Sequence, residues 1–63
     1  MAQYEVFNNI QIGKKFRTSA LITYQKVSTK ESKPILNSKN VAIANGQASS
    51  TFYNSRILLE VLN

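Results

Sequence analysis

The side chains that most catalytic and metal sites use are nearly absent from this chain. Its 63 residues contain three acidic ones, Glu5, Glu31 and Glu60, and no Asp, His or Cys. Zinc needs thiolate or imidazole ligands, and a calcium loop needs several carboxylates close together, so we expect no metal and no cofactor. Glu5 and Glu60 could meet for acid–base work, but each is more simply a solvated residue or the partner of a cation.

Nucleophilic catalysis without His would need a lysine that acts as a base beside a hydroxyl group. Ser28 with Lys30, and Tyr24 with Lys26, have the spacing that puts two side chains on one face of a strand. A lysine must be buried to act as a base at neutral pH, and these lysines flank a polar segment. The sequence therefore predicts a protein that is not an enzyme.

Because acids are scarce, the chain is basic, with a net charge of +5 at pH 7. A basic balance favours nucleic acid, anionic membranes or acidic proteins as partners. Lysine and arginine contact phosphates, and aromatic rings stack on unpaired bases. We predict that DNA or RNA is contacted by Lys14, Lys15, Phe16, Arg17, Tyr24, Lys26, Lys30 and Lys33. The alternative is that lysines at turns only keep a small β-protein soluble and discourage edge pairing.

The basic residues need a scaffold, and the hydrophobic pattern predicts strands for it. Alternating apolar residues predict a strand over 4–12, and the β-branched and aromatic residues of 16–27 predict a second one. Gly13, which can take a positive φ, would turn the chain between them into a hairpin. That hairpin would place the basic residues in two patches, with Lys14, Lys15 and Arg17 at one end and Lys26, Lys30 and Lys33 at the other.

The middle of the chain is less clearly patterned. Residues 28–34 are polar and end in the single proline, which predicts a mobile loop. Asn45-Gly46 is typical of a type I′ hairpin turn within 41–48. The competing interpretation is a helix over 39–45 with Ser38 as its N-cap, and we favour the hairpin.

The C-terminal segment, 49–62, has two interpretations. As a helix, it would begin near 49–51 and align Tyr53, Ile57 and Val61. As a strand, it would carry apolar side chains on both faces, which must then be covered on both sides. In so short a chain, the second cover would come from another copy. We therefore predict a homo-oligomer whose interface consists of Ile57, Leu58, Leu59, Val61 and Leu62.

These patterns predict a mainly β protein, a single small domain over 1–63 with a sheet or barrel of about five short strands. The alternative is an α+β fold with a mid-chain or C-terminal helix packed on the sheet. No apolar run approaches the roughly 20 residues of a transmembrane helix, and the first residues lack the pattern of a signal peptide. We expect a cytoplasmic protein without membrane contact, and the sequence shows no resemblance to a known family.

Two functions fit this description. The first is a non-enzymatic nucleic-acid-binding module that acts as an oligomer through phosphate contacts, because oligomerisation would multiply a modest charge per subunit. The second is a structural or inhibitory interaction protein, encoded by a phage or another mobile element, that self-assembles or adds a strand to a partner's sheet. The charge slightly favours the first.

Overall fold

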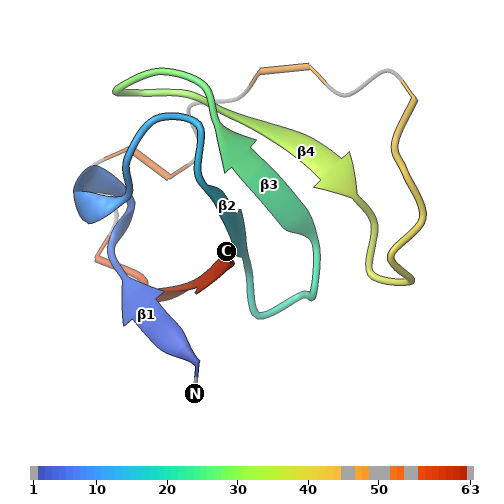
Figure 1. Ribbon diagram of the computed structural model, residues 1–63, viewed down its shortest axis with the longest axis horizontal. Helices are drawn as coiled ribbons and strands as arrows, with labels where there is room; N and C mark the ends of the chain where they lie inside the picture. The colour runs from blue at the N-terminus through green and yellow to red at the C-terminus, as the bar shows by residue number, and fades with distance from the viewer. Residues whose placement is uncertain (1, 45–46, 49–51, 54–55, 63) are drawn as a thin grey trace.

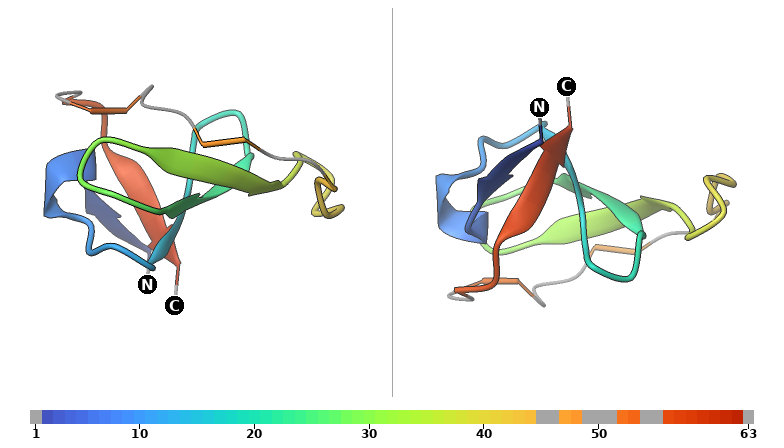
Figure 2. Two further views of the ribbon diagram at one scale, coloured as in Figure 1. Left: turned by 90° about the horizontal axis from the view of Figure 1, so that it is seen from above. Right: turned by 90° about the horizontal axis from the view of Figure 1, so that it is seen from below.

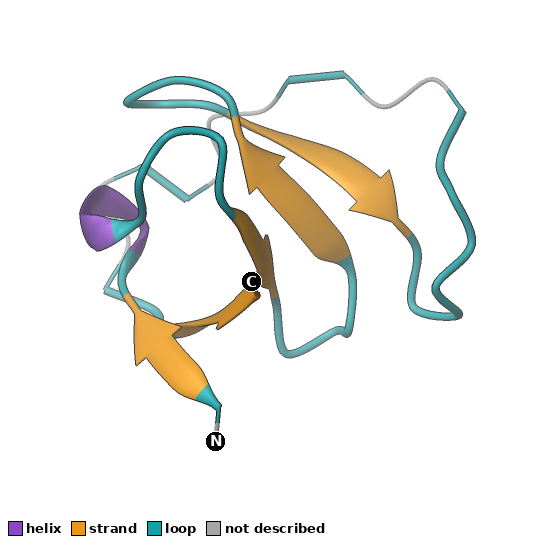
Figure 3. Ribbon diagram, viewed as in Figure 1, coloured by secondary structure: helices purple, strands orange, loops and turns teal. Residues whose placement is uncertain are grey.

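The computed structural model describes residues 2–44, 47–48, 52–53 and 56–62. Within these ranges the chain forms one sheet of five antiparallel strands (Figure 1, Figure 3). The predicted mainly β class is confirmed. The described residues contain no α-helix, so the α+β alternative is wrong for them, and the sheet does not close into a barrel. The elements are β1 (Gln3–Glu5), the 3-10 helix η1 (Phe7–Asn9), β2 (Lys15–Arg17), β3 (Thr23–Lys26), β4 (Ser32–Leu36) and β5 (Leu59–Leu62).

The sheet brings distant parts of the chain together. Its strand order is β1-β5-β2-β3-β4, so the last strand lies between the first and the second. Val61 of β5 is opposite Gln3 of β1 on one side and opposite Phe16 of β2 on the other. The sheet twists as it runs, so β1 and β5 stand in a different plane from β4 (Figure 2).

The predicted hairpin between 4–12 and 16–27 is wrong. β1 ends at Glu5, and η1 then turns the chain, with the backbone N–H of Ile10 donating to the carbonyl of Phe7 at 3.1 Å. The second predicted strand is itself a hairpin, in which β2 and β3 pair across a turn over 18–22. The first strand pairs with β5 instead.

The turn over 18–22 was not predicted because it contains no Gly, Pro, Asn or Asp. Leu21 takes a positive φ of 65°, a region that Gly and Asn enter readily and that costs a bulky residue energy. Two backbone hydrogen bonds close the turn, from Leu21 N–H to the Thr18 carbonyl at 2.9 Å and from Thr18 N–H to the Ile22 carbonyl at 3.1 Å. The strand pairing on both sides thus holds Leu21 in an unfavourable conformation.

Gly13 behaves as predicted, although it does not join two paired strands. Its φ is +95°, and the N–H of Lys14 donates to the Gln11 carbonyl at 3.0 Å, which closes a turn of four residues. The Gly13 N–H donates to the carbonyl of Lys26 at 2.8 Å. This turn therefore leads from η1 into β2 and fastens the start of β2 to the end of β3.

The polar loop predicted over 28–34 is too long. Ser32 and Pro34 belong to β4, where an edge strand tolerates a proline because the missing N–H need not reach a neighbour. Residues 28–31 do form a tight bend, in which the Ser28 hydroxyl accepts the backbone N–H of Glu31 at 3.0 Å. The loop is therefore the connection between β3 and β4 rather than a break between two sheet portions.

The helix predicted as an alternative after Ser38 is also wrong over the residues described. The side-chain oxygen of Asn37 accepts the backbone N–H groups of Lys39 at 2.8 Å and of Val41 at 3.0 Å. The chain then returns along the edge of β4, where Ala42 bridges to Leu36. The predicted turn at Asn45-Gly46 lies outside the described residues.

The C-terminal segment follows the strand interpretation. Leu59–Leu62 is a strand and no helix occupies 56–62, while 49–51 and 54–55 lie outside the description. Leu59 is 1% exposed, because β1 and β2 flank β5 and turn this side chain into the core. We expected another copy of the chain to cover one face of this strand. For Leu59, residues of the same chain cover the side chain instead.

Aromatic rings make up most of the core. The ring of Phe16 stacks on Tyr24, with centroids 5.7 Å apart, and meets Phe7 and Phe52 edge-on at 5.8 and 5.4 Å. Offset stacks and edge-to-face contacts at such distances are favourable ring arrangements. The buried hydrophobic residues are Phe7, Ile10, Phe16, Phe52 and Leu59, with Tyr24 and Val61 packed against them.

The positive φ of Leu21 gives a testable prediction. Leu21→Asn should raise the free energy of unfolding by about 0.5–1 kcal/mol, because Asn enters the left-handed region at lower cost than Leu and Leu21, 53% exposed, buries little apolar surface. Urea unfolding measures the change, and Ala20→Asn, in the same turn, should bring no gain. A loss of stability in Leu21→Asn would contradict the strained turn.

Candidate nucleic-acid interface

The two faces of the sheet carry different side chains. Phe16 in the middle of β2 is opposite Tyr24 on one side and Val61 on the other, and we call the face that holds these three residues the inner face. Lys15 and Arg17 alternate with Phe16 along the strand, so they lie on the opposite, outer face. The outer face is therefore where the predicted phosphate contacts of β2 are found.

A row of three polar residues crosses the outer face. Lys15 of β2 is opposite Gln25 of β3, and Gln25 is opposite Lys33 of β4. Adjacent strands lie about 4.8 Å apart, so the Cα atoms of Lys15 and Lys33 are roughly 10 Å apart. Both lysines are exposed, and the Gln25 side-chain amide donates to the Gly13 carbonyl at 3.2 Å. We call Lys15, Gln25 and Lys33 the outer row.

An ion pair neutralises an acid beside this row. The Nη2 and Nε atoms of Arg17 lie 2.8 and 3.2 Å from Oε1 of Glu60 on the neighbouring strand β5. Arg17, predicted as a phosphate contact, is therefore engaged by a carboxylate. The pairing also means that Glu60 does not oppose an anion bound at Lys15.

The two patches predicted at opposite ends of a hairpin are wrong. Because the turn lies at 18–22 and not at Gly13, the start of β2 and the end of β3 meet at the same end of the sheet. The backbone N–H of Lys26 donates to the Lys14 carbonyl at 3.0 Å. The bend at 28–31, which carries the exposed Lys30, follows β3 at that same end. The structure thus gathers Lys14, Lys15, Lys30 and Lys33 at one end.

Lys26 is buried, and its predicted phosphate contact is wrong. The residue is 4% exposed, its Nζ atom donates to the Phe7 carbonyl at 2.9 Å, and this atom lies 4.3 Å from the centroid of the Phe7 ring. Burial lowers the pKa of Lys26 below the usual lysine value. We expected a solvated lysine here, but Lys26 packs β3 against η1. The buried Ser32 hydroxyl opposite it finds no hydrogen-bond partner among the described residues.

The aromatic residues predicted as stacking platforms belong to the core. Phe16 is 0% exposed, so its assignment to the interface is wrong. Tyr24 is half-buried, with Phe16 stacked on its ring and Phe52 edge-on at 5.0 Å. The exposed rings are instead Tyr4 and Tyr53, and the Nζ atom of Lys30 lies 5.5 Å from the Tyr53 ring centroid.

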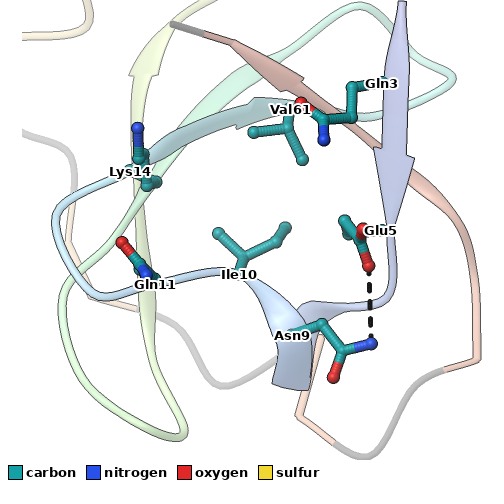
Figure 4. A pocket seen from close by; sticks show the side chains of 7 residues that line it. All are labelled: Gln3, Glu5, Asn9, Ile10, Gln11, Lys14 and Val61. Atoms are coloured by element: carbon teal, nitrogen blue, oxygen red, sulfur yellow. Dashed lines mark hydrogen bonds between the residues drawn. The ribbon is translucent and has the colours of Figure 1, made fainter.

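A pocket of about 620 Å³ opens on the inner face beside the core (Figure 4). We call it the inner pocket. Sequence analysis missed it, because it exists only where β1 pairs with β5 and η1 folds back across them. Its charged residues are Glu5 and Lys14. The lining residues are Gln3, Glu5, Asn9, Ile10, Gln11, Lys14 and Val61.

The two acids that might have met for acid–base work do not pair. Glu5 faces the inner pocket and accepts the side-chain amide of Asn9 at 3.4 Å, whereas Glu60 is held by Arg17 on the outer face. Tyr4, not Glu5, is opposite Glu60 in the β1–β5 pairing, so the two carboxylates occupy opposite faces.

The fold buries some residues of the predicted oligomer interface and leaves others exposed. Leu59 and Val61 point inward and belong to or pack against the core, so their assignment to an interface is wrong. Leu62 is half-buried opposite Lys15. Ile57 and Leu58 are 62% and 63% exposed. Because β5 pairs on both sides, the C-terminal strand itself cannot add to a partner's sheet.

Comparisons with protein-family models, with curated proteins and with solved structures found no match for this chain. No helix in the described part of the chain has the length and apolar character to cross a membrane. The assignment of the candidate interface therefore depends only on where its own residues lie in the sheet.

The lowered pKa of Lys26 predicts how stability depends on pH. On raising the pH, the folded protein releases this proton before the unfolded chain does at about 10.5, so between the two pKa values the unfolded chain binds more protons. The free energy of unfolding therefore rises with pH in that window, and the cost of burying the charge is fully present at neutral pH.

Lys26→Met removes this titration while retaining an apolar chain. Urea unfolding of both proteins at pH 7 and pH 10 should show the stability of the wild type rising relative to that of Lys26→Met. Comparing the two proteins at each pH removes the contributions to stability that they share. A difference that stays constant or falls between the two pH values would contradict the burial of a charged Lys26.

Proposed function

We propose that this protein is a non-enzymatic, cytoplasmic nucleic-acid-binding module that holds phosphates on the outer row. The observation that supports the proposal is the alignment of Lys15 and Lys33 on one exposed face, with the neutral donor Gln25 between them. Their Cα atoms are roughly 10 Å apart, so each lysine can contact a different phosphate of a bound strand.

The charges near the row favour an anion, because the exposed Lys15, Lys30 and Lys33 outnumber Glu31, the acid in the bend over 28–31. Glu60 is paired with Arg17, and Glu5 lies on the other face of the sheet. Lys30 adds a further cation at the same end of the sheet, beside the exposed ring of Tyr53. A cation next to an exposed aromatic ring is the combination by which proteins bind single strands, so a single strand is the form that we propose.

The proposed contacts predict that charge reversal on the row weakens binding. Lys15→Glu and Lys33→Glu should each lower the affinity for a labelled single-stranded oligonucleotide about tenfold at low salt, and should make its salt dependence shallower by about one phosphate contact. Fluorescence anisotropy over a range of salt concentrations measures both quantities.

Lys39→Glu is the matched control, because it changes the net charge equally but lies beyond the other end of β4, in the turn after Asn37. It should reduce the affinity much less than the two row variants. An equal loss in all three would mean that only net charge matters, and absence of wild-type binding at low salt would overturn the proposal.

We also propose that the protein self-associates through Leu58, as the nucleic-acid hypothesis includes and its interaction alternative allows. Leu58 is 63% exposed immediately before β5, whereas its neighbour Leu59 is 1% exposed. A chain of this size has a marginal core of its own, and small domains that lack disulfides often gain stability from association. The proposed occupant of this apolar position is a second copy of the chain.

Light scattering tests this association. The wild type should have a mass above that of the 7.1 kDa chain, and Leu58→Lys should reduce it to the monomer, because a buried unpaired charge is costly at an interface. Val41→Lys, at a residue 56% exposed beyond β4, should leave the mass unchanged. A wild type that is monomeric at high protein concentration would rule out self-association.

A further inference from the structure

The inner pocket has the volume of a small-ligand site, and the proposed phosphate contacts of the outer row do not use it. Its volume of about 620 Å³ falls in the range of roughly 300–1,000 Å³ that ligand sites occupy. Ile10 and Val61 lie in the middle of the pocket, between polar side chains (Figure 4). The site therefore offers an apolar surface surrounded by hydrogen-bonding groups.

Opposite charges stand on opposite sides of the pocket. Lys14 and Glu5 lie on opposite sides of Ile10 in Figure 4. The backbone of Lys14 is fixed twice, by donation to the Gln11 carbonyl and by acceptance from the Lys26 N–H, both at 3.0 Å. A ligand that spans the pocket therefore needs an anionic group at one end and a hydrogen-bond donor at the other.

Three side-chain amides, those of Gln3, Asn9 and Gln11, complete the polar lining. Amide side chains carry a donor and an acceptor, which match the edges of nucleobases, and a carboxylate accepts a hydrogen bond from an exocyclic amino group. A nucleotide combines the features that the pocket requires, since it has a phosphate, a flat ring and a polar base edge.

Resting on the proposed function, we infer that the inner pocket binds one unpaired nucleotide of the bound strand, with a base that carries an amino group. The base lies on Ile10 and Val61, its amino group donates to Glu5, and its phosphate lies toward Lys14. Lys14 and Lys15 are consecutive, and their side chains lie on opposite faces at the start of β2. A strand that crosses this end of the sheet thus reaches both the pocket and the outer row.

Base preference tests the inference. Labelled homo-oligonucleotides of deoxyadenosine and deoxycytidine should bind the wild type roughly tenfold tighter than one of thymidine, which lacks the amino group. Glu5→Leu, which removes the acceptor, should remove most of this preference. Glu31→Leu, which makes the same change in the bend between β3 and β4, should retain it. In the wild type, the side-chain amide NMR signals of Gln3, Asn9 and Gln11 should shift on adding the deoxycytidine oligomer and not the thymidine one.

The outcomes separate the two proposals. Equal affinity for all three oligomers, or no change in the amide signals, would overturn the pocket inference, and the proposed function would stand if Lys15→Glu still weakened binding. A base preference that survives Glu5→Leu would also overturn the inference. A preference that depends on Glu5 in a protein insensitive to Lys15→Glu would support the pocket and reject the outer row. No binding of any oligomer at low salt would reject both.

Discussion

The fold depends on the packing around Phe16, because this ring is the point at which distant segments meet. Phe16 contacts Phe7 from η1, Tyr24 from β3 and Phe52 from the segment before β5. A chain of 63 residues can bury only a small core, so a few rings must pack against several elements at once. Val61 of β5, opposite Phe16, packs against the same cluster, which places the last strand beside the second.

This small core also explains why the inner face is open at one end. The inward positions of β1 are Gln3 and Glu5, opposite Val61 and Leu59, and polar side chains of this kind cannot close an apolar core without loss of hydration. The core therefore stops at Ile10 and Val61, and the inner pocket lies where the polar positions begin. The pocket is a consequence of the strand alternation, since every second residue of β1 faces inward whether it is apolar or not.

The sequence predicted features that local chemistry determines and missed those that depend on distant contacts. The predictions of a mainly β class and of a positive φ at Gly13 were correct, since β-branched residues and glycine have conformational preferences that depend little on distant contacts. The turn at Leu21 was missed because leucine gives no sign of a left-handed conformation, and the pairing of β5 with β1 and β2 has no local signature. With the hairpin misplaced, Lys15 and Lys33 were assigned to different patches, although the sheet aligns them. Lys26 could not be identified as buried, because the group that accepts its hydrogen bond, the Phe7 carbonyl, belongs to η1.

Charge counted along a sequence is therefore a poor measure of the charge that a surface presents. Lys26 is buried, and Arg17 is paired with Glu60. Neither of these two predicted contacts therefore offers an unpaired cation at the surface. The lysines that remain at one end of the sheet are few, and each phosphate contact contributes only a modest, salt-dependent share of the affinity. A module of this kind gains specificity only if something other than phosphate is also bound. The proposed binding of a base in the inner pocket would meet that condition, and the pocket lies within reach of the outer row because Lys14 lines the pocket while the next residue, Lys15, belongs to the row.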